Sequence, residues 1–139
     1  MKEGFTVLEE INVPSSFDYL ASVEGLIDRV CNAVGVSEDH YGNVLIAVTE
    51  AFNNAVTHGN QGDSAKEVRL VVSKNMDELC FLIADQGEGF DFENVLDPTA
   101  PENIEKENGR GIYLMRHLAD EVAFENAGRE VAIYFQVNG

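Results

Sequence analysis

Three short polar clusters stand out in the sequence because their residue types could together hold a nucleotide. They occupy residues 50–60, 85–90 and 108–111 and are separated by apolar segments typical of strands and helices. The first supplies carboxamides and a carboxylate, the second an acid followed by glycines, and the third two glycines flanking an arginine. Carboxamide oxygens suit Mg²⁺, and glycine turns let the backbone approach phosphates closely. The combination and order of the clusters favour a nucleotide site.

Glu50 and Asn54 are the two candidate residues of the first cluster. They lie four positions apart, so on a helix they are neighbours on one face. Asn54 could supply an oxygen to Mg²⁺, and Glu50 could accept a proton from an attacking hydroxyl. The alternative is a solvated polar face, which most amphipathic helices possess. The adjacent pair Asn53 and Asn54 is locally unfavourable inside a helix, and this local cost favours a functional site.

Asp85 opens the second cluster directly after the apolar segment 79–84, which is typical of a buried strand. A carboxylate at a strand end can accept a hydrogen bond from an exocyclic amine, such as that of adenine. Gly87 and Gly89 permit close backbone approaches that other residues exclude. The alternative is an ordinary turn with a capping acid. The order of acid and glycines disfavours a dinucleotide-binding fold, and the GxxxxGK phosphate loop is absent.

Gly109, Arg110 and Gly111 belong to the third cluster, directly before a helix predicted over residues 112–118. Backbone N–H groups at such a helix start can bind phosphate oxygens, helped by the helix dipole. Arg110 could add a charge-assisted contact. The alternative is a flexible helix entry with a solvent-exposed arginine. The polar segment before it, residues 91–108, has the length of a lid over a bound ligand.

Hydrophobic periodicity predicts the elements that must position these clusters. An apolar stripe at spacings of three and four ends at Gly35, which indicates a first helix that starts around residues 14–16 and runs to residue 34. A second helix is predicted from residue 37 to about residue 58, with Gly59 as its C-terminal stop. This order predicts a single α+β domain over residues 1–139, a two-layer sandwich with a mostly antiparallel, mixed sheet. The predicted strands are residues 5–13, 66–73, 78–84, 122–126 and 130–137.

Composition limits the classes of partner and environment. The 139 residues are 45% hydrophobic, which fits one folded domain. Nine basic against 25 acidic residues give a formal charge of −16, which disfavours direct nucleic-acid binding and is compatible with a basic protein partner. Cys31 and Cys80 lie in apolar runs and are expected to be buried, reduced thiols. With no run long enough for a membrane span and no signal-peptide core at the N-terminus, we expect a cytoplasmic protein.

The three clusters, in this order, resemble the N box, first glycine box and second glycine box of the GHKL (Bergerat-fold) ATP-binding superfamily. The resemblance covers about residues 5–137, nearly the whole chain. Within the superfamily, the Glu-x-x-x-Asn pair, the short lid and the run Gly-Arg-Gly-Ile-Tyr-Leu-Met are similar to the anti-sigma-factor serine/threonine protein kinases of bacterial partner-switching systems. The resemblance implies the histidine-kinase-like ATPase fold.

The resemblance also implies a role for each candidate residue. Asn54 would hold Mg²⁺ bridging the ATP phosphates, Glu50 would be the general base for a serine hydroxyl, and Asp85 would read the adenine amino group. Gly87 would help to form the base pocket, and Gly89 would form the adjacent turn. The phosphates would be contacted by Gly109, Arg110 and Gly111.

The implied function is ATP-dependent phosphorylation of a serine on an anti-sigma-factor antagonist, together with sequestration of a sigma factor. A homodimer is the implied oligomer. Residues 98–107 depart from many relatives, because they are acidic and contain no glycine. This departure leaves a second function open, that of a nucleotide-binding regulatory module that sequesters a protein partner without catalysis.

Overall fold

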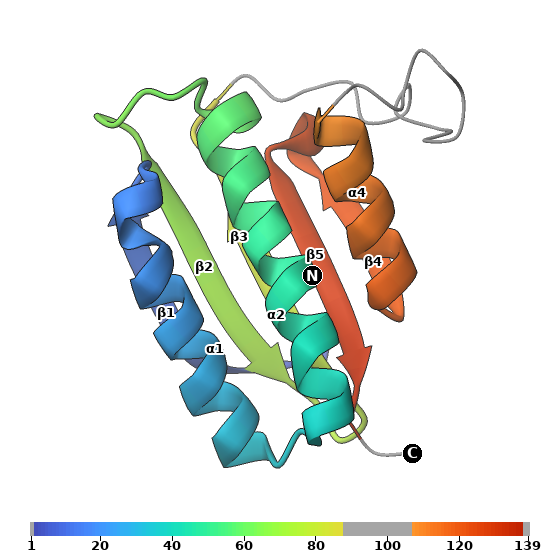
Figure 1. The fold of residues 1–139 in the computed structure, drawn as a ribbon. Helices are drawn as coiled ribbons and strands as arrows, with labels where there is room; N and C mark the ends of the chain where they lie inside the picture. The colour runs from blue at the N-terminus through green and yellow to red at the C-terminus, as the bar shows by residue number, and fades with distance from the viewer. Residues whose placement is uncertain (1, 88–106, 138–139) are drawn as a thin grey trace.

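The computed structural model describes residues 2–87 and 107–137, and of residues 107–112 and 127 it describes the backbone alone. A five-stranded sheet forms one layer and three helices form the other, with α2 lying between α1 and α4 (Figure 1). This is the predicted two-layer α+β architecture. The helices are α1 (Leu20–Val34), α2 (Glu38–Asn54) and α4 (Glu107–Leu118), with short turns η1 (Phe17–Tyr19), η2 (Ala55–Gly59) and η4 (Asn126–Gly128). The strands are β1 (Thr6–Pro14), β2 (Glu67–Lys74), β3 (Glu78–Ala84), β4 (Glu121–Glu125) and β5 (Glu130–Gln136).

The sheet has the order β1-β2-β3-β5-β4, and every described pairing in it is antiparallel. The prediction of a mixed sheet was therefore wrong in that detail. Short turns join β2 to β3 and β4 to β5, and such turns permit only antiparallel pairing. β5 lies between β3 and β4, and its register pairs Ala84 with Glu130. That register brings the residues that follow β3 next to the turn that precedes β5.

The first helix ends at the predicted residue, but it begins at Leu20 and not around residues 14–16 as predicted. The Ser16 side chain accepts a hydrogen bond from the Asp18 N–H at 3.2 Å and so caps the short turn η1, which leads into α1. Gly35 follows the last helical residue with a φ of 84°, a left-handed conformation that glycine adopts at little cost. Between these ends one stripe is buried, consisting of Val23, Leu26, Ile27, Val30 and Cys31.

The second helix ends differently from the prediction. α2 continues into η2, a five-residue π-helical turn, and Gly59 lies inside that turn without a left-handed conformation. The chain instead turns at Gln61 and Gly62, which have φ values of 54° and 75°. The sequence offers two glycines here, and the second is the one that takes the positive φ. Gly59 packs instead against the turn after β3.

Phe52 is among the largest fully buried side chains of the core between helices and sheet, with 1% of its surface exposed. Phe52→Ala leaves a cavity there, so we expect the free energy of unfolding to fall by about 3–5 kcal/mol in chemical denaturation. Ile46→Ala is the control on the same helix, because Ile46 is 45% exposed. The control should lose less than about 1 kcal/mol. Equal losses from the two variants would contradict this placement of the core.

The helix α4 begins at Glu107 and not at residue 112 as predicted. Gly109, Arg110 and Gly111 therefore lie within the helix and do not form a turn ahead of it. A glycine in a helix costs about 1 kcal/mol relative to alanine, but tertiary packing can offset that cost. α4 packs along α2 and buries Met115, which supplies such packing.

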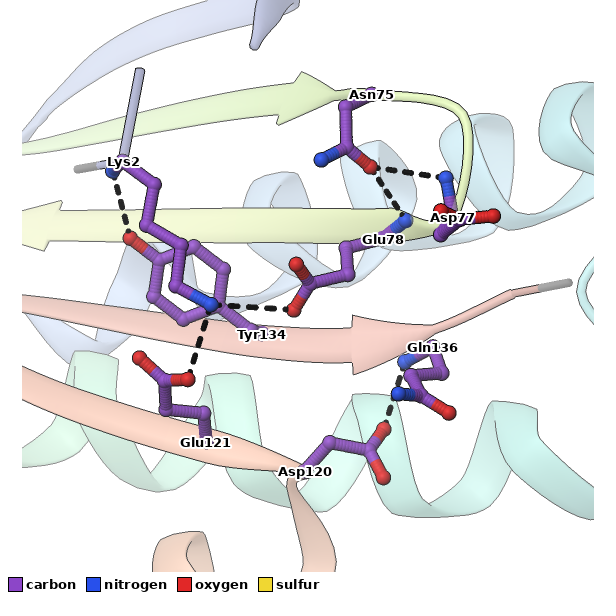
Figure 2. A network of polar contacts seen from close by, with 8 residues as sticks. All are labelled: Lys2, Asn75, Asp77, Glu78, Asp120, Glu121, Tyr134 and Gln136. Atoms are coloured by element: carbon purple, nitrogen blue, oxygen red, sulfur yellow. Dashed lines mark hydrogen bonds and ion pairs between the residues drawn. The ribbon is translucent and has the colours of Figure 1, made fainter. Parts of the chain in front are cut away.

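The face of the sheet turned away from the helices carries a second apolar cluster, and the N-terminal residues form a strap over it. The Lys2 backbone N–H donates to the Tyr134 hydroxyl at 2.9 Å, and the Lys2 ammonium lies 4.4 Å from the centre of the Tyr134 ring (Figure 2). The same ammonium pairs with Glu121 at 2.9 Å and with Glu78 at 3.5 Å. The buried members of the cluster are Val71, Cys80, Leu82, Ala132 and Tyr134.

The two cysteines and the lengths of the helices relate to the environment expected for the chain. Cys31 and Cys80 are both free and buried, as predicted, and burial raises the pKa of each thiol to about 11. In the part of the chain that the structure describes, no helix combines the length and the apolar character that crossing a bilayer requires.

Candidate functional site

A pocket of about 300 Å³, including its open mouth, lies where the end of α2 meets the end of β3 and the turn between β4 and β5. Asn54 and Asp85, which are far apart in the sequence, both line it. Apolar lining with a few polar groups is typical of small-molecule sites. The apolar lining consists of Ala51, Ala55, Ile83, Met115, Phe124 and Val131.

Asn54 brings an unpaired amide nitrogen to this pocket. Its Nδ2 atom is buried and makes no hydrogen bond within the described residues, and the same is true of Oδ1 of the neighbouring Asn53. Buried polar atoms without partners are costly and rare, so Asn54 is suited to an external ligand. Rotation about the terminal side-chain bond exchanges the amide oxygen and nitrogen, and Asn54 can therefore present either atom.

The donor set of the pocket fits Mg²⁺ better than a metal ion held by protein alone. Within residues 2–87 and 107–137, no group of three or more His, Cys, Asp or Glu side chains is arranged to hold a metal ion. Mg²⁺ usually takes one or two protein oxygens and completes its shell with water and substrate phosphates. A single amide oxygen from Asn54 is compatible with that kind of coordination.

Asp85 follows the last residue of β3 and is held by backbone groups on both sides. Its N–H donates to the Arg129 carbonyl at 2.9 Å, and its Oδ1 accepts the Gly87 N–H at 2.8 Å. Burial raises the pKa of the Asp85 carboxyl, while the Gly87 N–H and the charges of Arg129 and Lys66 act in the opposite direction. A carboxylate accepts several hydrogen bonds, so the Gly87 N–H leaves capacity for the amine of a ligand.

Two glycines allow the end of α2 and η2 to approach Asp85. A Cβ atom on Gly59 would lie 2.3 Å from Oδ2 of Asp85, and a Cβ atom on Gly87 would lie 1.7 Å from the Gly59 carbonyl oxygen. Both distances are far below van der Waals contact, so both positions require glycine for steric reasons. Sequence reasoning placed Gly87 in this turn but missed the role of Gly59, which looked like an ordinary helix stop.

The turn between β4 and β5 forms a third side of the pocket that the sequence did not indicate. Gly128 and Arg129 line the pocket, and Arg129 places a positive charge near Asp85. They lie there because Ala84 pairs with Glu130. Only the pairing of the final hairpin with β3 could have pointed to them in advance.

The other candidate residues are placed less directly. Glu50 is half-buried on α2, one helical turn before Asn54, and does not line the pocket. Gly109, Arg110 and Gly111 lie at the start of α4, the helix that brings Met115 to the pocket. Gly89 and the Arg110 side chain lie outside the described part of the chain. The roles of these residues stay predictions.

Comparison with known proteins identifies the family of this chain. Residues 13–135 match the family model of the histidine kinase-like ATPase domain. The serine-protein kinase RsbW of Bacillus subtilis (strain 168) is 34% identical to this chain over 137 residues, which cover 94% of this chain and 86% of the relative. RsbW of Oceanobacillus iheyensis is 32% identical over 123 residues, with coverage of 84% and 78%. RsbW of Bacillus cereus (strain Q1) is 32% identical over 128 residues, with coverage of 88% and 79%. This chain belongs to the histidine kinase-like ATPase family.

Proposed function

We propose that this chain is an ATP-dependent serine-protein kinase that phosphorylates a serine on an anti-sigma-factor antagonist and sequesters a sigma factor. The observation that carries the proposal is the pocket that both Asn54 and Asp85 line. The relatives are serine-protein kinases by name, which supports a protein serine as the phosphate acceptor.

ATP binding is assigned to groups of this pocket. Asp85 accepts a hydrogen bond from the exocyclic amine of adenine, and the apolar lining contacts the faces of the base. Asn54 would hold Mg²⁺, which when bound neutralises phosphate charge. Gly87 helps to form the base pocket, and Gly89 forms the adjacent turn. The phosphates are contacted by Gly109, Arg110 and Gly111.

Glu50 is the proposed general base. As the serine oxygen bonds to the γ-phosphorus, Glu50 takes the hydroxyl proton, and the bond from the γ-phosphorus to the bridging oxygen breaks to release ADP. Glu50 lies one helical turn from Asn54, so a hydroxyl that approaches the phosphates can come within its reach. Because Glu50 does not line the pocket, the group that takes the proton is distinct from the groups that bind adenine.

The proposed partners are two proteins, a sigma factor and its antagonist. The formal charge of −16 suits partner surfaces rich in Lys and Arg and opposes direct binding of nucleic acid. A homodimer, which the family resemblance implies, and a cytoplasmic location, which the sequence pattern indicates, complete the proposal.

Incubation with γ-labelled ATP, Mg²⁺ and a candidate antagonist tests the kinase directly. We expect label on the antagonist and none on a variant antagonist whose acceptor serine is alanine. Nucleotide binding without transfer of label would favour the non-catalytic regulatory module, which the acidic, glycine-free residues 98–107 support. Absence of nucleotide binding in calorimetry would overturn both functions.

Asn54→Ala should abolish the effect of Mg²⁺ on ATP affinity. Calorimetry with Mg²⁺ and with EDTA should show tightening by at least about 10-fold in the unaltered chain and almost none in the variant, because the variant lacks the proposed protein ligand. Asn53→Ala is the matched control, since it removes the same amide from the adjacent position, which does not line the pocket. A Mg²⁺ effect that survives in Asn54→Ala would show that the metal assignment is wrong.

A further inference from the structure

Asn60 is completely buried, with 0% of its surface exposed, although it belongs to a polar turn and does not line the pocket. Its Nδ2 donates to the Glu67 carbonyl at 3.0 Å, and its Oδ1 accepts the Gln86 N–H at 2.8 Å. Its own N–H donates to the Ala55 carbonyl at 2.8 Å and closes η2. One residue therefore connects the end of η2, the start of β2 and the turn after β3.

Gln86 completes a closed ring of hydrogen bonds with Asn60 and Glu67. The Glu67 N–H donates to Oε1 of Gln86 at 2.7 Å. Glu67 accepts from Asn60, Asn60 accepts from Gln86, and Gln86 accepts from Glu67, so each residue donates once and accepts once within the ring. Such a closed arrangement fixes the relative positions of three segments better than separate hydrogen bonds do, because no member can move without breaking two of them.

Asp85 lies between two segments that the ring holds in place. Gln86 directly follows Asp85, and Asn60 directly follows Gly59, against whose Cα the Asp85 carboxylate packs. The Gly87 N–H, one residue further, binds Oδ1 of the same carboxylate. The position of Asp85 in the pocket therefore depends on Asn60 and Gln86, even though neither residue lines it.

We propose that Asn60 and Gln86 are positioning residues that set the base specificity of the pocket. They hold the Asp85 carboxylate where it can accept a hydrogen bond from the 6-amino group of the purine. This inference rests on the proposed function, in which Asp85 reads adenine. The ring acts on recognition of the base more than on the triphosphate, since its side-chain hydrogen bonds hold the turn that follows Asp85.

The ratio of two affinities tests the inference: ATP against purine riboside 5′-triphosphate, which differs from ATP by the missing 6-amino group. Calorimetry should show that the unaltered chain prefers ATP by about 10- to 100-fold, as expected for a hydrogen bond to a carboxylate. Asn60→Ala breaks two hydrogen bonds of the ring and Gln86→Ala breaks one. We expect the preference to fall by about 5- to 20-fold in Asn60→Ala and by a smaller factor in Gln86→Ala, because a misplaced carboxylate loses the amine. The affinity for purine riboside 5′-triphosphate should change little.

Two further variants separate positioning from general destabilisation. Gln86→Glu keeps an acceptor for the Glu67 N–H and should restore most of the preference lost in Gln86→Ala. Ile27→Val lowers stability in the buried stripe of α1, a helix that contributes no residue to the ring, and should leave the preference unchanged. Gln86 is exposed, so its variants are expected to fold even if Asn60→Ala does not.

The outcomes distinguish the inference from the function on which it rests. If the unaltered chain shows no preference for ATP, Asp85 does not read the base and the proposed nucleotide recognition fails. If that preference exists but Asn60→Ala and Gln86→Ala retain it, or lose affinity equally for both triphosphates, the ring is merely structural and the inference is overturned while the function stands.

Discussion

Replacing Glu50 with alanine is expected to lower phosphoryl transfer to the antagonist by about 10²- to 10⁴-fold, the range usual for loss of a general base. ATP affinity should stay unchanged, because Glu50 does not line the pocket that holds the base. Phosphoryl transfer depends mainly on positioning and charge neutralisation, so few catalytic side chains are expected and the loss of one base should be measurable. Single-turnover transfer of γ-label and calorimetry with ATP give the two quantities separately.

Glu38→Ala is the matched control for Glu50→Ala. Glu38 is the first residue of the same helix and carries the same charge, at the end away from the pocket. The control should transfer phosphate at the normal rate. Normal turnover in Glu50→Ala would remove Glu50 from the mechanism, and an equal loss of ATP affinity would assign it to nucleotide binding.

Gly87→Ala should weaken ATP binding by about 10- to 100-fold, the value of a lost hydrogen bond to a charged group. The added Cβ would lie 1.7 Å from the Gly59 carbonyl oxygen and 3.1 Å from Oδ1 of Asp85, so the turn must move and take the carboxylate with it. Neither neighbour can yield easily, because Gly59 belongs to the backbone of η2 and Asp85 is bonded through its N–H to the Arg129 carbonyl.

Gly42→Ala provides the comparison for that variant. Gly42 lies on α2, and a Cβ atom there meets no atom within 4 Å. Alanine at this helical position should leave ATP affinity unchanged and raise the free energy of unfolding by up to about 1 kcal/mol. If Gly87→Ala also binds ATP normally, the close packing of the two glycines does not control the position of Asp85.

Local sequence signals predicted most of the elements. The apolar stripe between Ser16 and Gly35 specified α1, because capping and a left-handed glycine are decided by neighbouring residues. Alternating strands with short turns specified the antiparallel hairpins. The start of α4 was misplaced, since the glycines at 109 and 111 signal a turn locally while packing on α2 favours a helix.

The candidate site was only partly predictable for a related reason. Asn54 and Asp85 could be selected by residue type and spacing, and the structure places both at one pocket. Gly59 and Asn60 could not, because their roles depend on contacts with residues more than 20 positions away, which no local pattern encodes. Arg129 required knowledge of strand register. Long-range geometry, not residue chemistry, was the missing information.

The strap formed by Lys2 has a consequence for how the molecule responds to its solvent. With nine basic and 25 acidic residues, the chain has few positively charged side chains. One of them, Lys2, forms ion pairs with both Glu78 and Glu121 on the face of the sheet turned away from the helices. Exposed ion pairs of this kind are screened by dissolved electrolyte, whereas the apolar core is not. Rising ionic strength therefore acts on the N-terminal segment before it acts on the pocket, which lies on the other side of the sheet.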